Sequence, residues 1–184
     1  CSVRRQRQMC IRDRAQTASL DLTPPPPPSF AEASRATKLF RGFEEHVLPG
    51  CFVCGIDREA RDGLRIFPGP ANDDGLFAAP WTPDPSLRTG ASDELDDAFV
   101  WAALDCPGAF SFPQVDGVVL LGEMRTRRFA TVGIGEACVV TSWVIAHDGR
   151  KHVTGTALHG EDGACRAHAR AVWIEVARDA VPGD

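Results

Sequence analysis

The sequence predicts one α+β domain in which a curved antiparallel sheet wraps around a single central buried helix. Residues 95–105 are apolar on nearly every side, as in a helix that lies inside a core. Four long segments of alternating apolar and polar residues follow, and the pairs Asp148-Gly149 and Asp162-Gly163 join the last three. Because Asp-Gly is typical of two-residue hairpin turns, these three segments should form an antiparallel meander.

The length and net charge of the chain predict the number of domains and exclude some classes of partner. The chain has 184 residues, 43% of them apolar, which is enough for one core and too little for two comfortable domains. Acidic residues outnumber basic ones by 25 to 20, so we expect no nucleic-acid or membrane partner. No stretch reaches the roughly 18–20 apolar residues that span a bilayer, and residues 1–29 lack the apolar core expected of a secretory signal. We therefore predict a cytoplasmic protein whose partner is a small molecule or another copy of the chain.

The start of the chain differs in composition from the rest. Residues 1–14 are basic and resemble a translated sequencing adapter, so we interpret them as non-native; a nucleic-acid-binding arm is the alternative. The prolines Pro24–Pro28 fix φ at roughly −65° and favour an extended linker. We assign residues 1–29 to a non-native or disordered leader with this linker, 30–178 to the folded domain and 179–184 to a disordered tail.

Other elements follow from local signals. Ser92 precedes a run of acids and is expected to cap the central helix, because acids are favourable at the positive end of a helix dipole. Pro107 and Gly108 should end or kink that helix. The earlier elements are a short helix within 30–46, where Leu39, Phe40 and Phe43 have helical spacing, and two short strands at 63–67 and 75–79.

The four long strands carry a clear alternation. They are predicted at 118–129, 137–147, 151–159 and 165–176. On the last strand one face consists mainly of small residues, namely Cys165, Ala167, Ala169 and Ala171, followed by Trp173. A face of small side chains lets another element come close, so we expect this face to lie against the central helix.

Three stretches carry a family resemblance. Residues 51–55 (CFVCG), 63–70 (GLRIFPGP) and 101–108 (WAALDCPG) together resemble an uncharacterised branch of hotdog-fold, thioesterase-like proteins. The resemblance covers about residues 51–176 and implies a hotdog fold. It also implies a homodimer or higher homo-oligomer with its site between two central helices, and action on an acyl-CoA or acyl-carrier thioester. We expect no cofactor.

One helix can supply the groups that thioester hydrolysis needs. These are donors for the carbonyl oxygen and a carboxylate that activates water or attacks directly. The unpaired N–H groups at the helix start are such donors, and an acid seven or eight residues later lies on the same side. Asp105 has this spacing from Ala98 and Asp97. We predict Asp105 as the catalytic residue, and Asp97, Ala98 and Trp101 as substrate-binding residues.

The resemblance is closest to the phenylacetyl-CoA type of hotdog thioesterase. There the helix opens with His-Gly-Gly and carries its acid eight residues after the first glycine. Asp105 matches the acid, whereas Asp96, Asp97 and Ala98 stand where the triplet would be. Two alternatives stay open: Asp105 as a structural carboxylate near the Pro107 kink, and the acids of the first turn as simple compensation of the helix dipole.

The cysteines and histidines predict no metal centre. Cys51 and Cys54 have the spacing of a zinc or redox knuckle, but no second such pair follows, and a closed structural zinc site needs four ligands. We therefore expect a packed turn and no metal, with Cys106 or a histidine left as the residue that could complete a site. The histidines lack metal-ligand spacing, and the seven cysteines are too scattered for a disulfide framework.

Basic residues cluster on the later strands. They are Arg125, Arg127, Arg128, Arg150, Lys151, Arg166 and Arg170. Guanidinium groups suit the phosphates of coenzyme A, and a solvated strand face that protects a sheet edge is the alternative. No serine-hydrolase elbow or dinucleotide fingerprint is present, which argues against hydrolases of that class, kinases and dehydrogenases. The competing function is a non-catalytic module that binds an acyl or aromatic ligand or only dimerises.

Overall fold

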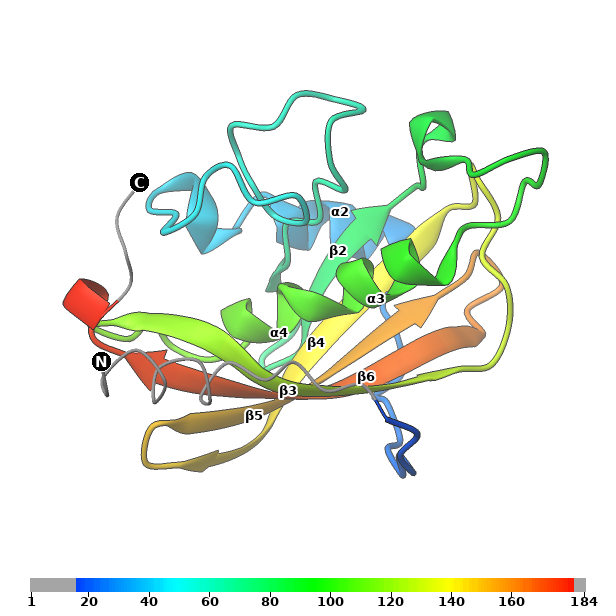
Figure 1. Ribbon diagram of the computed structural model, residues 1–184. Helices are drawn as coiled ribbons and strands as arrows, with labels where there is room; N and C mark the ends of the chain where they lie inside the picture. The colour runs from blue at the N-terminus through cyan, green and yellow to red at the C-terminus, as the bar shows by residue number, and fades with distance from the viewer. Residues whose placement is uncertain (1–15, 181–184) are drawn as a thin grey trace, which may run out of the picture.

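A computed structural model describes residues 16–180, so the predicted non-native residues 1–14 and the last four residues lie outside the described part (Figure 1). Six antiparallel strands form one sheet in the order β1-β2-β4-β5-β6-β3, which confirms the α+β class and the predicted meander. No helix within the described residues is long and apolar enough to cross a membrane. The strands are β1 (Gly69–Pro70), β2 (Phe77–Trp81), β3 (Val118–Arg128), β4 (Cys138–Asp148), β5 (Lys151–His159) and β6 (Cys165–Val176).

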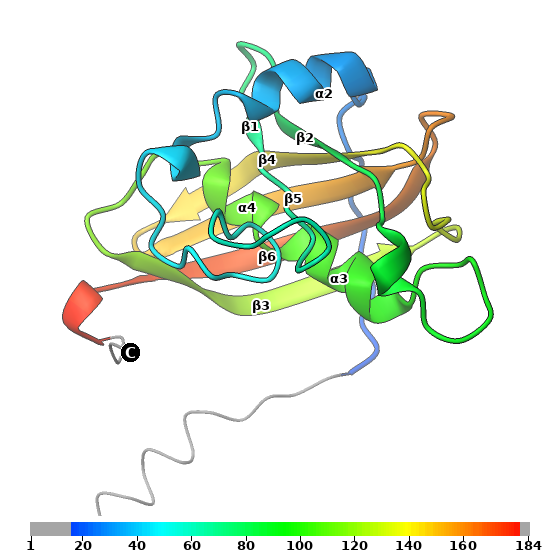
Figure 2. The same cartoon turned by 90° about the horizontal axis from the view of Figure 1, so that it is seen from above.

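Two helices lie end to end along one face of this sheet (Figures 1 and 2). They are α3 (Asp97–Asp105) and α4 (Pro107–Phe110). Leu104 of α3 is fully buried in one core cluster with Val140 of β4 and Leu158 of β5. The Thr156 hydroxyl of β5 donates a 2.8 Å hydrogen bond to the carbonyl oxygen of Leu104. The apolar side of α3 is therefore packed on the sheet, and its last turn is tied to β5.

The predicted small-residue face of β6 lies against this helix. Ala167 and Ala169 are completely buried and belong to the same cluster as Ala103 of α3. A larger side chain at either strand position would push the helix away from the sheet, so alanine is the residue that the close approach requires. The prediction that this face meets the helix is confirmed.

The start of α3 differs from the prediction. Its cap is Asp96, whose carboxylate accepts a 2.8 Å hydrogen bond from the Ala98 N–H. Ser92 instead accepts from the N–H of Glu94 in the preceding loop. The physical reason is that Glu94 pairs with Gly133 in an isolated bridge, and this extended pairing holds the chain out of the helix until it has passed Leu95. The predicted end is confirmed, because α4 begins at Pro107, where a missing N–H costs nothing.

The strand predicted at 63–67 is wrong. Gly63 has φ +123° and Arg65 has φ +55°, and both values lie outside the strand region. Leu64 and Ile66 are nevertheless buried, and their N–H groups donate to the carbonyl oxygens of Phe52 and Val53. The alternation of apolar residues therefore reported burial correctly, although the segment forms irregular backbone rather than a strand.

The first helix is shorter than the range within which it was expected. α2 (Phe30–Thr37) begins with a capping box between Ser29 and Glu32 and ends before the residues whose spacing suggested it. A single turn, η1 (Arg41–Phe43), follows. Phe40 lies between these two elements and is buried against Phe67 and Phe110. The remaining single turns are η2 (Pro85–Leu87) and η3 (Arg178–Ala180).

The second face of the sheet is covered by α2 and by the proline segment. Ala33 of α2 packs on Val139 of β4, and successive strand residues point to opposite faces, so this face is opposite to that of Val140. Trp143 lies on the same face, where its ring covers Gly155. Pro25 and Pro26 line a cavity together with Trp143. The described part of the leader thus lies beside the sheet face that α3 does not cover.

Two buried histidines predict a pH-dependent stability. Burial lowers the pKa of His159 and of His168, and the charge of Arg127 lowers the pKa of His168 further. In the unfolded chain both imidazoles take up a proton at about pH 6.5, whereas in the folded chain they do so only at lower pH. The unfolded state therefore binds more protons, and the free energy of unfolding should fall as the pH is lowered below about 6.5.

Urea unfolding between pH 7.5 and pH 5 measures this effect. The His168→Gln variant should lose less stability than the wild type over that interval, because one buried imidazole no longer has to be protonated. If the free energy of unfolding falls equally with pH in both proteins, burial of the neutral His168 imidazole does not contribute to the loss of stability at low pH.

Candidate functional site

The predicted catalytic and binding residues lie on one helix. Ala98, Trp101 and Asp105 are separated by three and four residues and therefore share a side of α3. This side faces away from the sheet: Asp97 and Ala98 are exposed, and Trp101 is 46% exposed. Asp105, at the last position of the helix, is half-buried. The helix thus presents Asp97, Ala98 and Trp101 on an exposed side and carries Asp105 half-buried at its end.

The polar groups in the first turn of α3 already have partners within the chain. The Ala98 N–H, a predicted donor to a substrate carbonyl, donates to the carboxylate of Asp96. The carboxylate of Asp97 forms an ion pair with Arg128 of β3. A substrate oxygen can therefore use the Ala98 N–H only after the side chain of Asp96 has turned away.

The carboxyl group of Asp105 is partly buried, and one of its oxygen atoms lacks a hydrogen-bond partner among the described residues. Its Oδ1 atom is buried and has no hydrogen-bond partner among residues 16–180. Burial raises the pKa of this carboxyl to about 6, and negative charge on Cys51 contributes in the same direction. A carboxyl whose pKa lies near neutrality can exchange protons with a substrate under ordinary conditions. Perturbed carboxyl groups of this kind are enriched at functional sites.

Three cysteines meet beside Asp105. The sulfur atoms of Cys51, Cys54 and Cys106 all lie within 4.8 Å of one another, and those of Cys51 and Cys106 are 3.5 Å apart. Hydrogen bonds from the thiols of Cys106 and Cys54 lower the pKa of Cys51. The pKa of Cys106 is raised, first because its thiol donates to Cys51 and then by Cys54 and burial. The cluster therefore favours a thiolate at Cys51.

An apolar cavity adjoins the three sulfurs. Its volume is about 160 Å³, and it lies between the loop that contains His46, the helix α4 and the first half of β3. Arg41 contributes a charge to the wall, but its guanidinium donates to the carbonyl oxygens of Ala109 and Phe112. The apolar lining comes mainly from Val47, Leu48, Phe110, Phe112, Val115, Val118, Val119, Leu120 and Trp173.

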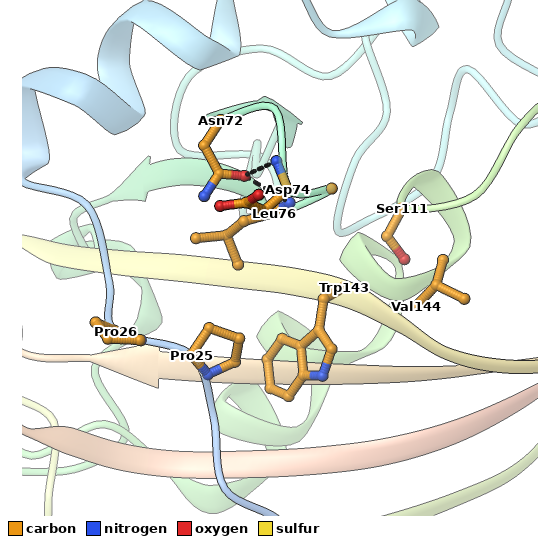
Figure 3. Close-up of a pocket in the computed structure, with 9 residues that line it drawn as sticks. Pro25, Pro26, Asn72, Asp74, Leu76, Ser111, Trp143 and Val144 are labelled. Carbon is orange, nitrogen blue, oxygen red and sulfur yellow. Dashed lines mark hydrogen bonds between the residues drawn. The ribbon is translucent and has the colours of Figure 1, made fainter.

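The cavity lined by Pro25, Pro26 and Trp143 has a volume of about 470 Å³ (Figure 3). Asn72 lies on its rim, where its side-chain oxygen accepts hydrogen bonds from the N–H groups of Asp74 and Leu76. That oxygen is used to hold a turn. The groups with perturbed pKa values gather instead at the cysteine cluster and Asp105, so we place the candidate site there.

Three of the seven clustered basic residues of the later strands are paired with acids. Arg166 forms an ion pair of 2.8 Å with Glu136, and Arg125 one of 2.6 Å with Glu123. Arg128 is held by Asp97. These three pairs fit the interpretation of a charged strand face. Among the described residues no ion pair involves the other four, Arg127, Arg150, Lys151 and Arg170.

Comparison with known proteins bears on the fold. No protein-family model matches the chain, and no curated protein matches its sequence. The PaaI protein of the phenylacetic acid degradation operon of E. coli aligns with a TM-score of 0.50 and 11% identity, over 55% of this chain and 73% of its own. A hypothetical thioesterase from Streptococcus pneumoniae, solved with coenzyme A, aligns with a TM-score of 0.51 and 7% identity, over 56% and 83%. The chain has a hotdog fold.

A third structure matches the hotdog domain over a greater length. Cj0977, a sigma28-regulated virulence protein from Campylobacter jejuni, aligns with a TM-score of 0.56 and 10% identity, over 79% of this chain and 91% of its own. At identities this low the similarity is one of fold. The hotdog fold that the sequence resemblance implied is thereby confirmed.

Sequence reasoning named the polar part of this site and missed its apolar wall. The Cys-x-x-Cys spacing pointed to Cys51 and Cys54 and left Cys106 or a histidine to complete a site, and the structure places Cys106 beside them. The apolar wall was missed because Phe110, Phe112 and Trp173 come from α4, the segment after it and β6. The available signal was that Cys106 directly follows the predicted catalytic Asp105.

Proposed function

We propose that this chain is a thioesterase-like hotdog protein, its sheet wrapped around α3, which hydrolyses an acyl-CoA or acyl-carrier thioester. The observation that carries the proposal is the Asp105 carboxyl, half-buried at the end of the helix with one oxygen unpartnered. The coenzyme A in the Streptococcus pneumoniae structure, which has the same fold, supports the substrate class.

Asp105 acts on water or on the thioester itself. As a base, its carboxylate takes a proton from water while the water oxygen attacks the carbonyl carbon. The carbonyl oxygen gains negative charge, the C–S bond then breaks, and the thiol leaves with a proton. A positioned carboxylate of this kind accelerates such a step by about 10²–10⁴-fold. N–H groups at a helix start stabilise the charge on the oxygen.

The distance along α3 supports a site built from two copies of the chain and speaks against the single helix that the sequence suggested for both the donors and the acid. Asp105 lies seven residues after Ala98, which is about 10 Å along a helix that rises roughly 1.5 Å per residue. The carbonyl group of one substrate therefore cannot contact both the Ala98 N–H and the Asp105 carboxylate of the same helix. We propose a homodimer in which Asp105 of one chain faces the α3 start of the other. Exposed apolar residues at Trp101, Leu120 and Leu121 support this interface.

The experiment is a panel of acyl-CoA thioesters incubated with the purified chain. Product should be followed by chromatography of released coenzyme A, because five free cysteines in the described residues would react with a thiol reagent. We expect turnover above that of heat-denatured protein for at least one acyl group, together with a dimer by light scattering. The absence of turnover across short, long and aromatic acyl groups would refute hydrolysis.

A non-catalytic hotdog module is the second candidate, and one observation favours it. The Asp96 carboxylate occupies the Ala98 N–H, and two acids stand at the helix start where an anionic oxygen would have to bind. This candidate predicts that acyl-CoA raises the melting temperature without being hydrolysed. The same panel distinguishes the two functions, since thermal stabilisation and product release are measured on the same samples.

A further inference from the structure

The cluster of Cys51, Cys54 and Cys106 has the geometry of a metal site. Zinc–sulfur bonds of about 2.3 Å at tetrahedral angles place two sulfurs roughly 3.8 Å apart. The three sulfurs lie within 4.8 Å of one another, with 3.5 Å between Cys51 and Cys106. Small rotations of the side chains therefore bring all three to the separations that one zinc ion requires.

The backbone around the first two cysteines forms the tight turn of a knuckle. The Gly55 N–H donates a 2.9 Å hydrogen bond to the carbonyl oxygen of Cys51. A Cβ atom at Gly55 would lie 2.4 Å from that oxygen and 2.5 Å from the carbonyl oxygen of Pro49, so only glycine fits. The turn directs both sulfurs to the same side, and the junction of α3 and α4 supplies the third from Cys106.

Among the described residues, the groups around the cluster are mostly apolar or already hydrogen-bonded. Cys54 is buried, and the adjoining cavity wall is mostly apolar. Arg41, which lines that wall, already donates to two carbonyl oxygens. Unpaired buried charges are costly, and a bound divalent cation removes this cost.

We propose that Cys51, Cys54 and Cys106 bind one Zn²⁺ ion as thiolates, with the fourth position open to the apolar cavity. All three cysteines line that cavity, so water or a small donor can enter there. Binding releases the protons that the cysteine thiols still carry and needs no oxidant. His46 is the nearest imidazole in this wall, but its Nδ1 accepts from the N–H of Leu48, which leaves its proton on Nε2 and makes it a poor ligand. Three protein ligands with one open position differ from a closed structural site.

The site is tested on the full chain purified under reducing conditions. Elemental analysis should find about one zinc per chain. Replacement of zinc by Co²⁺ should produce the sulfur-to-cobalt absorption and the intense visible bands of a tetrahedral thiolate site. X-ray absorption should show three sulfurs at about 2.3 Å and one lighter atom.

Variants identify the ligands. Cys106→Ser should weaken zinc binding by more than about 100-fold, since loss of an outer-sphere partner alone costs 10–100-fold. Cys165→Ser is the matched control, because Cys165 is a half-buried free cysteine outside the cluster, and it should bind zinc like the wild type. Asp105→Asn should also keep its zinc whatever it does to hydrolysis, so that failure of the metal proposal and failure of the proposed function are told apart.

Two outcomes would overturn the proposal. One is a reduced, folded wild-type chain that binds neither added Zn²⁺ nor Co²⁺. The other is a Cys106→Ser variant that binds zinc as tightly as the wild type. If Cys106→Ser does not fold, the cobalt spectrum of the wild type still tests the proposal. The intensity of the sulfur-to-cobalt absorption rises with the number of thiolate ligands, so it distinguishes three thiolates from one or two.

Discussion

The Asp105→Asn variant is expected to hydrolyse its acyl-CoA substrate at least about 100-fold more slowly than the wild type, with little change in KM. Asparagine has nearly the shape of aspartate, so packing at the end of α3 should be kept, but its amide cannot accept a proton or attack a carbonyl. General-base catalysis contributes about 10²–10⁴-fold, and its loss falls on kcat because the base acts in the transition state.

A matched control separates this effect from a loss of negative charge. Asp73 is exposed in the loop before β2, so Asp73→Asn removes one charge without touching the site and should leave turnover unchanged. Circular dichroism should show the same fold for both variants. If Asp105→Asn keeps turnover within about threefold of the wild type, Asp105 is a structural carboxylate and the proposed mechanism is wrong.

The Leu104→Ala variant is expected to lower the free energy of unfolding by about 2–5 kcal/mol, the usual cost of truncating a buried leucine. Leu104 has no exposed surface and packs among Val140, Leu158 and Ala103. The hydrogen bond from Thr156 to its carbonyl oxygen holds the backbone in place, so the helix cannot easily move to fill the space. A loss of this size is a large share of the roughly 5–15 kcal/mol that stabilises a typical domain.

Urea denaturation measures this loss, and Leu39→Ala is the control. Leu39 is 65% exposed, so the same chemical change there should alter stability by no more than about 0.5 kcal/mol. A change below about 1 kcal/mol for Leu104→Ala would mean that the last turn of α3 is not part of the core.

The strands of the meander could be predicted because their signals are local. Alternation of apolar and polar residues marks a strand with one buried face, and Asp-Gly at Gly149 and Gly163 supplies the positive φ that tight hairpins need. The packing of α3 on the sheet was also predictable from its apolar residues, but the helix is not buried on every side as expected, because Asp97, Ala98 and Trp101 are exposed. The segment 63–67 was mispredicted because apolar alternation indicates only which residues are buried. Its backbone has positive φ angles at Gly63 and Arg65, which no alternation of side chains predicts.

By itself the sequence determined the α+β class, the antiparallel meander, a helix packed on the sheet and the position of Asp105 at that helix's end. Only the tertiary structure decided that Asp96 caps the helix and occupies the Ala98 N–H. It also decided that Cys106 joins Cys51 and Cys54, which stand 52 residues and more before it in the chain. The physical reason is range: periodicity and turn chemistry act between neighbours, whereas a site is made of side chains that only packing brings together.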